Sequence, residues 1–370
     1  MSLKTKVLRN VIAGYVIRKV AKRALRRQGK TLALAAGGIG VLLAGREVIR
    51  RAREYDLRDK VVLITGGSRG LGLVLARECV SQGARVAICA RDQQELELAR
   101  QDLLQRGGKA IAIPCDLTSQ AEVEEMVQSV QKQFGRIDVL INNAGIITVA
   151  PAEEMTLSDY EQAMGVNYWA AFHTANAVLP AMRDRREGRI VNIASIGSKI
   201  SVPHLLPYSA SKFALYGWSL GLRAELAKDG IVVTTICPGL MRTGSPRNAT
   251  FKGQHRAEYA WFSIGDSLPF IAMGAERAAR QILTACKRGE AEAVLSLPAK
   301  VAATVNSLFP NVTADLLGLV TRLLPGPGGI GARGVRGSES ESTVSPSILT
   351  TMGDKAALRN NEYAAASRER

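Results

Sequence analysis

The stretch that decides the fold reads Val61-Val62-Leu63-Ile64-Thr65-Gly66-Gly67-Ser68-Arg69-Gly70-Leu71-Gly72. An apolar, β-branched run leads directly into a glycine-rich turn, and a helix-length amphipathic segment follows. Glycines let the backbone of such a turn approach a pyrophosphate closely, and the helix N-terminus behind it supplies N–H groups and a partial positive charge. We therefore expect a dinucleotide to bind at Thr65, Gly66, Ser68, Arg69, Gly70, Leu71 and Gly72.

The same alternation of short apolar runs and helix-length segments continues to about residue 297. It predicts strands over residues 61–65, 85–90, 110–115, 137–142, 189–194, 231–237 and 293–295. It predicts helices over residues 71–82, 93–106, 121–134, 159–183, 209–228 and 275–288. This rhythm indicates an α/β fold of the Rossmann type, in which helices cover both faces of a doubly wound parallel sheet of about seven strands.

The end of the second predicted strand indicates which dinucleotide binds. NAD-binding folds often place an acid there to accept from the ribose hydroxyls, whereas this chain has Ala90 followed by Arg91. A planar guanidinium suits a 2'-phosphate, and Arg69 in the glycine turn could reach the same group, so we predict NADP(H) as the cofactor. The alternative is that both are ordinary surface arginines. Asp92 is expected to cap the next helix.

A tyrosine and a lysine suggest the chemistry. Tyr208 and Lys212 are four residues apart and therefore project from one face of the predicted helix. A phenol with a pKa of about 10 is a poor acid at neutral pH, and a nearby ammonium lowers that pKa by favouring the phenolate. Such a pair alone is common on solvated helix faces. Because Ser195 lies thirteen residues upstream of Tyr208, at the end of an apolar run, we predict a catalytic site.

With Asn142-Asn143-Ala144-Gly145 and with Pro238-Gly239 and Thr243, these motifs resemble the short-chain dehydrogenase/reductase family over roughly residues 57 to 295. The resemblance implies that Tyr208 is the general acid/base, that Lys212 binds the nicotinamide ribose and lowers the tyrosine pKa, that Ser195 holds the substrate oxygen, and that Asn167 supports a water-linked proton relay. It also implies cofactor contacts at Asp116 and Leu117 near the adenine, at Asn143, Ala144 and Gly145 along the cleft, and at Pro238, Gly239 and Thr243, the last beside the carboxamide. We expect no metal, and a homodimer or homotetramer.

The segment between Thr243 and Ala275 is predicted to form a lid over the substrate. Its aromatic residues, and two leucines just before the catalytic tyrosine, favour an apolar substrate. These residues are Phe251, Tyr259, Trp261, Phe262, Leu205 and Leu206. The alternative is that the aromatic side chains belong to the core.

The positive charge is concentrated at the N-terminal end of the chain. The formal net charge is +16, and residues 1–60 hold 16 Lys and Arg against 4 Asp and Glu, so the remainder does not suggest a nucleic-acid partner. Residues 1–54 are interpreted as a basic amphipathic helix followed by an uncharged stretch over residues 31–45, shorter than the ~20 residues that span a bilayer. We expect membrane association, with a helix docked on protein as the alternative.

The expected domain organisation is an anchor over residues 1–54, an NADP-binding catalytic domain over 55–297, apolar helices over 298–324 and a tail over 325–370. Gly, Pro, Ser and charge dominate the tail, so we expect it to be mostly disordered. The five cysteines are widely spaced and mostly within apolar runs, which predicts buried reduced thiols in a reducing compartment. We therefore expect the catalytic domain in the cytoplasm.

Three functions remain open at this point. The leading hypothesis is an NADPH-dependent oxidoreductase that interconverts a carbonyl and an alcohol on a lipophilic substrate. A second is reduction of a 3-ketoacyl thioester, in which a basic surface would attract an acidic carrier protein. A third is a membrane-tethered NADP-binding scaffold without turnover, although a pure binder has no need of Ser195, Tyr208 and Lys212 at these spacings.

Overall fold

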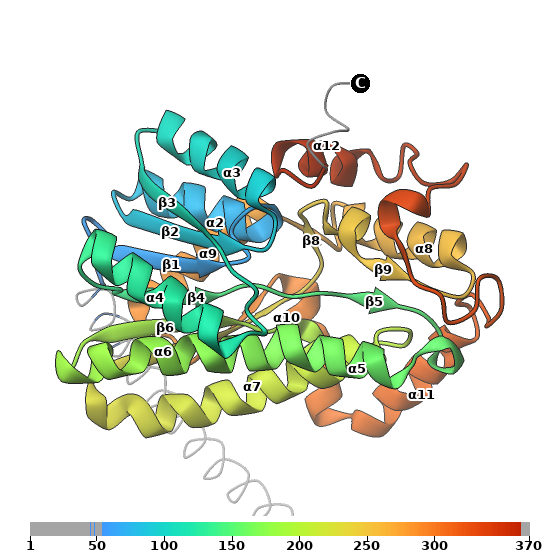
Figure 1. The fold of residues 1–370 in the computed structure, drawn as a ribbon. Helices are drawn as coiled ribbons and strands as arrows, with labels where there is room; N and C mark the ends of the chain where they lie inside the picture. The colour runs from blue at the N-terminus through green and yellow to red at the C-terminus, as the bar shows by residue number, and fades with distance from the viewer. Residues whose placement is uncertain (1–44, 46–47, 49–53, 364–370) are drawn as a thin grey trace, which may run out of the picture. The chain divides into compact units, whose positions relative to one another are not determined.

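The computed structural model describes residues 45, 48 and 54–363, so the predicted anchor lies almost entirely outside the described residues. The centre of the fold is a seven-stranded sheet in the order β11-β7-β6-β4-β1-β2-β3, and every pairing in it is parallel (Figure 1). Its strands are β1 (Val61–Thr65), β2 (Arg85–Ala90), β3 (Lys109–Pro114), β4 (Val139–Asn142), β6 (Gly188–Ile193), β7 (Ile231–Pro238) and β11 (Glu292–Leu295). The predicted doubly wound parallel sheet is confirmed.

Helices cover both faces of this sheet. One hydrophobic cluster contains side chains of α2 (Gly70–Ser81), α3 (Gln93–Gln105) and α9 (Ala275–Arg288). The other contains side chains of α4 (Gln120–Phe134), α6 (Ala170–Asp184) and α7 (Leu206–Leu226). Because successive strand residues point to opposite faces, Val62 and Ile64 of β1 pack in the first cluster and Val61 and Leu63 in the second. Both faces are buried, which explains why the strands are continuously apolar.

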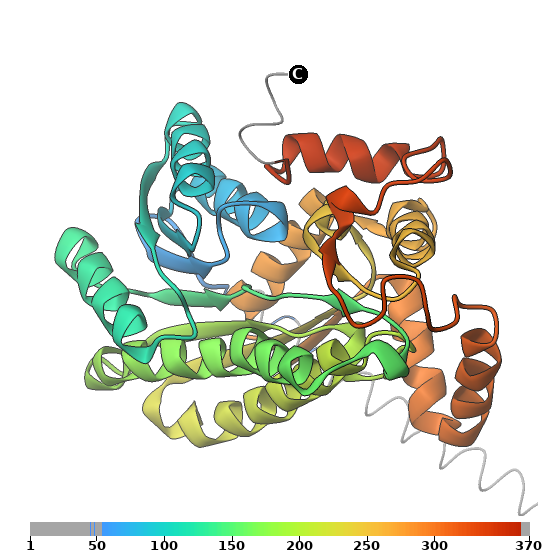
Figure 2. The same cartoon turned by 45° about the vertical axis from the view of Figure 1, so that its right-hand side comes forward.

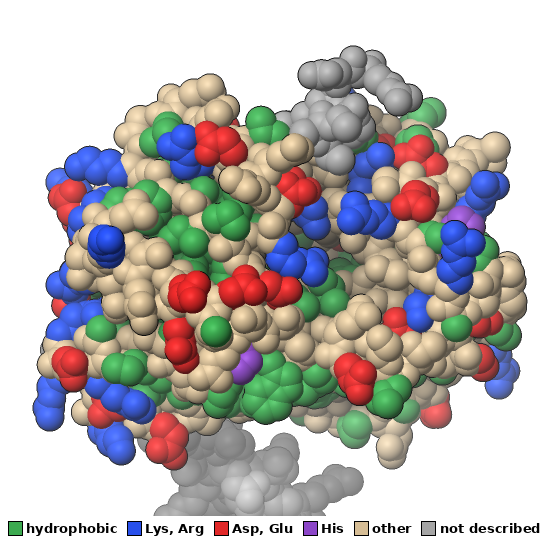
Figure 3. Space-filling model, viewed as in Figure 1, with side chains coloured by type: hydrophobic (Ala, Val, Ile, Leu, Met, Phe, Trp, Pro, Cys, Tyr) green, Lys and Arg blue, Asp and Glu red, His purple; other side chains and the backbone are tan. Residues whose placement is uncertain are grey.

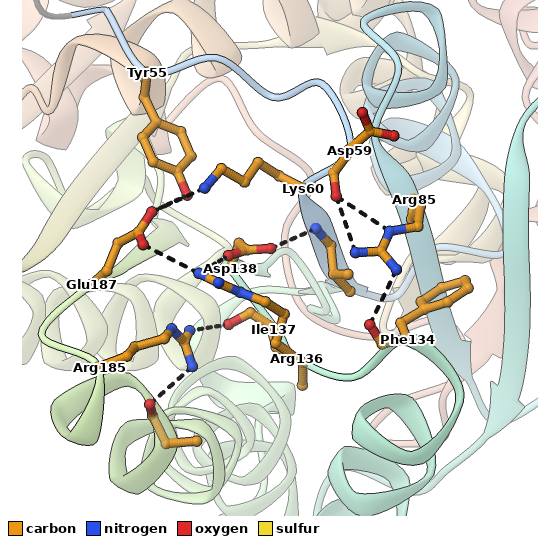
Figure 4. A network of polar contacts seen from close by, with 12 residues as sticks. Tyr55, Asp59, Lys60, Arg85, Phe134, Arg136, Ile137, Asp138, Arg185 and Glu187 are labelled. Atoms are coloured by element: carbon orange, nitrogen blue, oxygen red, sulfur yellow. Dashed lines mark hydrogen bonds and ion pairs between the residues drawn. The ribbon is translucent and has the colours of Figure 1, made fainter.

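A polar network joins the amino ends of the central strands (Figure 4). The Asp138 carboxylate is 1 % exposed, accepts from the Val61 backbone N–H at 2.8 Å and pairs with Arg136 at 2.5 Å. Glu187, just before β6, receives the Lys60 ammonium at 3.0 Å and the Tyr55 hydroxyl at 3.2 Å. These contacts fix β1, β4 and β6 at the end of the sheet opposite to its carboxyl edge, where open α/β sheets bind their ligands.

Two small sheets and a helix stand over the carboxyl edge. One sheet pairs β5 (Thr148–Val149), β9 (Thr250–Phe251) and β12 (Val335–Arg336), and the other pairs β8 (Met241–Arg242) with β10 (Met273–Gly274). The helix is α8 (His255–Ser267). Phe251, Tyr259 and Phe262 are at most 6 % exposed and form a cluster of their own, against which Tyr208 and Trp261 pack. The core alternative is therefore correct for these three aromatic residues.

Two helices, α10 (Leu297–Leu308) and α11 (Pro310–Thr321), follow the last strand of the sheet, where apolar helices are predicted. Several of their apolar side chains are exposed, among them Leu308, Leu316 and Leu319. Among the described residues, no helix is both long and apolar enough to cross a membrane. On the face shown in Figure 3, basic and acidic side chains are interspersed.

The prediction of a mostly disordered tail is wrong for residues 325–363. This segment contains β12, which pairs antiparallel with β9, and α12 (Thr351–Arg359), which lies above α8 (Figures 1 and 2). Ser345 is fully buried, and its hydroxyl lies 2.8 Å from that of Ser263 on α8. Small polar side chains that are buried by hydrogen bonding leave no apolar periodicity in the sequence. The folded structure of this segment could therefore not be predicted from periodicity.

The predicted thiol state is confirmed: none of the five cysteines forms a disulfide, and all are buried. They lie on α2, β2, β7 and α9 and just after β3, at positions 79, 89, 237, 286 and 115. Burial raises the pKa of Cys115 to about 12 and those of Cys237 and Cys286 to about 11.

Candidate active site

The glycine turn joins the end of β1 to the start of α2 in a conformation that side chains would block. Gly66 has a φ of +63°, and a Cβ on Gly72 would lie 2.0 Å from the Gly66 carbonyl oxygen. The Thr65 hydroxyl accepts from the backbone N–H groups of Asn143 and Ala144 at 2.9 and 3.0 Å. The Asn143 amide in turn donates to the Thr65 and Gly66 carbonyls at 3.0 and 3.1 Å. The predicted residues after β1 and β4 therefore form one rigid edge.

The N-terminus of α2 provides the donor set that a phosphate needs. Arg69 is the N-cap residue, but its side chain makes no capping hydrogen bond. The backbone N–H of Gly70, the first helical residue, donates instead to the carbonyl oxygen of Asn360 at 2.8 Å. An acceptor from another part of the chain thus occupies the anion-binding end of the helix. Ser68 and Leu71 are buried beside it. The residues present fit a dinucleotide.

The two arginines predicted to select NADP(H) differ in their surroundings. The Arg69 guanidinium pairs with Glu95 at 2.7 Å and with Glu362 at 3.5 Å. Arg91 is exposed. Asp92 accepts from the Glu95 backbone N–H at 2.8 Å, so the predicted cap of α3 is confirmed. Arg91 is therefore the more accessible of the two cations.

Asp116 and Leu117, the predicted cofactor contacts after β3, lie in different surroundings. Asp116 accepts from the backbone N–H and hydroxyl of Thr118 at 2.9 and 2.8 Å. These hydrogen bonds, assisted by the charge of Arg91, lower the pKa of Asp116. The carboxylate is half-buried and ionised at neutral pH. The Leu117 side chain packs in the core below the sheet edge.

Ser195 and Tyr208 meet at the carboxyl edge of the sheet. Ser195 lies two residues after the end of β6, is 8 % exposed, and its Oγ accepts from the Gly197 backbone N–H at 2.9 Å. Tyr208 lies in the first turn of α7, and the neighbouring Ser195 side chain acts to lower its pKa. A Cβ on Gly197 would lie 3.3 Å from both Ser195 Oγ and Tyr208 Cε1, so a glycine keeps the pair uncrowded. Ser195 and the Tyr208 ring thus lie side by side around Gly197.

Lys212 lies one turn further along α7 and is 4 % exposed. Its ammonium donates to the Ile193 carbonyl at 2.9 Å and lies 5.8 Å from the centroid of the Tyr208 ring. Burial lowers the pKa of Lys212 to about 8. Burial also raises the pKa of Tyr208, against the lowering effect of the Ser195 hydrogen bond. The expected lowering of the tyrosine pKa is thus not the net result, because burial of the phenol dominates.

Asn167 lies in a π-helical turn, Gly165–Trp169, between α5 (Leu157–Met164) and α6. The sequence predicted one continuous helix here, and π-turns often occur at functional sites. The Asn167 amide accepts from the Ile146 N–H at 2.8 Å and donates to the Ile146 carbonyl at 3.1 Å and to Ser211 Oγ at 2.8 Å. Ser211 Oγ donates to the Tyr208 carbonyl at 2.8 Å. Ser211 thus links Asn167 to α7, and only its inward position at i+3 from Tyr208 could have indicated this.

Gly145 lies close to the side chains of both Asn167 and Lys212. A Cβ there would be 3.0 Å from Asn167 Oδ1 and 3.4 Å from Lys212 Nζ. Pro238 ends β7, and Gly239 packs against α10, since its Cβ would lie 2.9 Å from Ser296 Oγ. Thr243 is 4 % exposed and accepts from the Ser245 N–H at 3.2 Å. The glycine turn, Ser195 and the residues after β7 thus follow the carboxyl ends of three strands of the parallel sheet.

A buried pair beside the lid was missed by the sequence reasoning. The Glu258 carboxylate on α8 is 0 % exposed, lies 2.8 Å from His204 Nδ1, and accepts from Trp261 Nε1 at 2.6 Å. His204, four residues before Tyr208, is 6 % exposed and has a φ of +64°. The pair ties α8 to the start of the catalytic helix. It joins positions 54 residues apart, and no local pattern indicates such a contact.

Comparison with known proteins agrees with this geometry. The family described as short chain dehydrogenase matches residues 60–252. The chain is 37% identical over 270 residues to "Dehydrogenase/reductase SDR family protein 7-like" of Anopheles gambiae, which covers 71% of this chain and 83% of that protein. It is 40% identical over 191 residues to "Putative ketoacyl reductase" of Streptomyces coelicolor, which covers 50% of this chain and 72% of that protein. A crystal structure of a short-chain dehydrogenase from Streptomyces avermitilis superposes with a TM-score of 0.61 at 29% identity and covers 71% of this chain and 97% of that one.

The chain belongs to the short-chain dehydrogenase/reductase family. It therefore has the fold of a family of oxidoreductases. Members of this family use NAD(P)(H) and act on CH–OH and C=O groups.

Proposed function

We propose that the protein is an NADP(H)-dependent reductase or dehydrogenase that interconverts a carbonyl and an alcohol on a lipophilic substrate. The observation that carries the proposal is the close approach of Ser195 and Tyr208 beside Gly197, with the Lys212 ammonium buried 5.8 Å from the Tyr208 ring centroid. A module that only bound a dinucleotide would not need to bury a hydroxyl, a phenol and an ammonium together at the same edge.

The side chains can share the work as follows. When bound, the nicotinamide supplies or takes up the hydride. Ser195 and Tyr208 donate to the substrate oxygen, on which negative charge develops during reduction, and Tyr208 passes it a proton. The Lys212 ammonium, protonated below about pH 8, stabilises the phenolate that remains. Asn167, held from both sides by Ile146, orients the path through which a proton returns.

The preference for NADP(H) is proposed from charge. Arg91 is exposed next to the end of β2, and no acid follows that strand at the first position. Arg69 contributes less, because its guanidinium is already in contact with the carboxyl groups of Glu95 and Glu362. A guanidinium contact with a phosphate is charge-assisted and discriminates by about 1.5–3 kcal/mol.

The lipophilic substrate is proposed from the lid. Phe270 is 92 % exposed and Ile271 is 45 % exposed in the segment after α8. The aromatic cluster of Phe251, Tyr259 and Phe262 belongs to the same predicted lid, and Tyr208 itself packs against it. Exposed apolar side chains in a predicted lid favour an apolar ligand over a charged one.

Reduction of a 3-ketoacyl thioester is the second candidate, and the similarity to a protein named putative ketoacyl reductase favours it. One experiment separates the candidates: NADPH oxidation by the full-length protein with lipophilic ketones, aldehydes and 3-ketoacyl thioesters. We expect turnover with the first two classes. Turnover with thioesters alone would replace the leading proposal by the second, and no turnover with any class would leave a binding protein.

We also propose that residues 1–52 associate with a membrane. Support comes from the sequence: basic residues add about 1 kcal/mol each near an anionic surface, a contribution that salt screens, whereas burial of the uncharged stretch persists in salt. Full-length protein should sediment with anionic vesicles and be only partly released by salt, while a chain that begins at Arg53 should stay in the supernatant. Equal sedimentation of the two forms would refute the proposal.

A further inference from the structure

The C-terminal segment Asn360–Glu362 lies directly against the glycine turn. Besides the Asn360 carbonyl that accepts from Gly70 N–H, the Asn361 amide donates to the Ser68 carbonyl at 2.8 Å and to the Glu95 carbonyl at 3.2 Å. All three residues of the segment are at most 5 % exposed. A polar segment that is buried so completely, and that bonds the backbone of the turn at both Ser68 and Gly70, behaves as a ligand of that turn.

The same segment also contacts residues that follow β7. The Asn360 amide donates to the Thr243 carbonyl at 3.3 Å. The Asn248 amide donates to the Glu362 backbone carbonyl at 2.9 Å and to its carboxyl Oε2 at 2.6 Å. The segment therefore connects the turn after β1 with the segment after β7, which are the two edges predicted to hold the ends of the cofactor.

The Glu362 carboxyl group takes the place that an anion would occupy at the start of α2. A Cβ built on Gly70 would lie 2.5 Å from Glu362 Oε1, so no space remains above that residue. The Arg69 guanidinium lies 3.5 Å from Glu362 Oε2. An acidic group, a carbonyl oxygen and a guanidinium at a helix N-terminus reproduce the contacts of a bound phosphate.

We propose that Asn360–Glu362 is a built-in competitor of the dinucleotide, so that the chain binds either its own C-terminal segment or the cofactor at the glycine turn. This inference rests on dinucleotide binding by the family and is independent of the carbonyl substrate and of the choice between NADP(H) and NAD(H). The competition lowers the apparent affinity for the cofactor by the fraction of molecules whose turn is open.

The helix before the segment can serve as its anchor. On α12, Ala357 packs against Gly244, where a Cβ would lie 2.3 Å from the Ala357 Cα, and Gly353 packs against Ser267 of α8 in the same way, at 2.5 Å from its Oγ. Figure 2 shows α12 above α8 with one end near α2. An anchored helix keeps the segment at a high effective concentration, so it closes again whenever the cofactor leaves.

Low pH should strengthen the docking of Asn360–Glu362 on the glycine turn. Burial raises the pKa of Glu362 to about 7, with Glu95 acting in the same direction and Arg69 and Arg247 against it, and Asp266 of α8 faces the same carboxyl. A group whose pKa is raised by docking favours docking fully below its ordinary pKa and loses that contribution as pH rises towards 7. The segment should therefore compete more strongly at pH 6 than at pH 8.

Equilibrium binding of NADPH and of NADH, followed by nicotinamide fluorescence without any substrate, tests the competition. A chain that ends at Arg359 should bind both dinucleotides about tenfold more tightly than the full-length chain, with a larger ratio at pH 6 than at pH 8. A chain that ends at Tyr363 is the matched control and should bind like the full-length chain. Asn361→Ala, which removes the hydrogen bonds to the Ser68 and Glu95 carbonyls and leaves the length unchanged, should tighten binding about threefold.

Hydrogen exchange on the full-length chain gives a second measurement that needs no variant. Added NADPH should speed exchange of the amides of residues 360–363 and slow exchange of residues 66–72. Equal affinities for the chains ending at Arg359 and Tyr363, or added protection of residues 360–363 by the cofactor, would overturn the inference and indicate that the segment completes the site. If the shorter chain does not fold, Asn361→Ala and hydrogen exchange decide. Binding by no form would refute the dinucleotide site as well, whereas normal binding without turnover would refute only the proposed reaction.

Discussion

Replacement of Tyr208 by Phe should remove the proton donor while leaving the ring in place. The substitution removes one polar atom near the Ser195 side chain, so the free energy of unfolding should change by only about 1 kcal/mol. General acid/base catalysis contributes about 10²–10⁴-fold, and we expect kcat of Tyr208→Phe to fall by at least that range. The dissociation constant for NADPH should change less than about threefold, because the ring still packs against the lid cluster.

Tyr216→Phe is the matched control for this variant. Tyr216 lies two turns further along α7, and its hydroxyl donates to Glu292 at 2.8 Å, outside the proposed site. Steady-state kinetics at saturating NADPH, fluorescence titration of NADPH and thermal unfolding should be measured for both variants. The control should keep its kcat. If Tyr208→Phe retained more than about one tenth of the kcat of the control, Tyr208 would not be the general acid.

Three further outcomes follow from the site. Arg91→Ala should weaken NADPH by about 1.5–3 kcal/mol and NADH far less; equal losses in a fluorescence titration would contradict the NADP(H) assignment. The kcat/KM for carbonyl reduction should fall as pH rises through about 8, since burial lowers the pKa of Lys212 to that value and its ammonium is lost above it. A rate that rises between about pH 7 and pH 9 would exclude a required ammonium. Glu258→Ala should lower the free energy of unfolding by about 2–4 kcal/mol in urea, because His204 and Trp261 each lose a buried acceptor. Glu258→Gln, which keeps an acceptor, should lose less, and identical losses would show that the contact itself is unimportant.

The sheet was predictable because its residues obey one simple pattern. Strands buried on both faces must be apolar at every position, so β1 and β2 lie at the predicted positions. The helix α9 also has its predicted bounds, 275–288, because its apolar residues recur along one face. The break of the long helix at Asn167 was not predictable, since the five residues of the π-turn contain no helix-breaking proline.

The site was predictable as a set of positions and less so as an environment. The glycine turn, Ser195, Tyr208 and Lys212 follow from local motifs, and the fold brings them to one edge. The net direction of the Tyr208 pKa depends on burial, which no local pattern contains. The contacts of His204 with Glu258 and of Asn361 with Ser68 join distant segments through single hydrogen bonds. Such contacts carry no periodicity, so sequence reasoning cannot find them.

Because all five cysteines are buried, the rate at which their thiols react reports how often the structure around them unfolds. A thiolate is the species that reacts, and burial holds these groups in the thiol form, so a folded molecule presents no nucleophilic sulfur to a disulfide reagent or to peroxide. Each sulfur can react only after its own strand or helix has separated from the sheet. The cysteines lie on α2, β2, β7 and α9 and just after β3. The order in which they become labelled therefore reports which of these elements separates first.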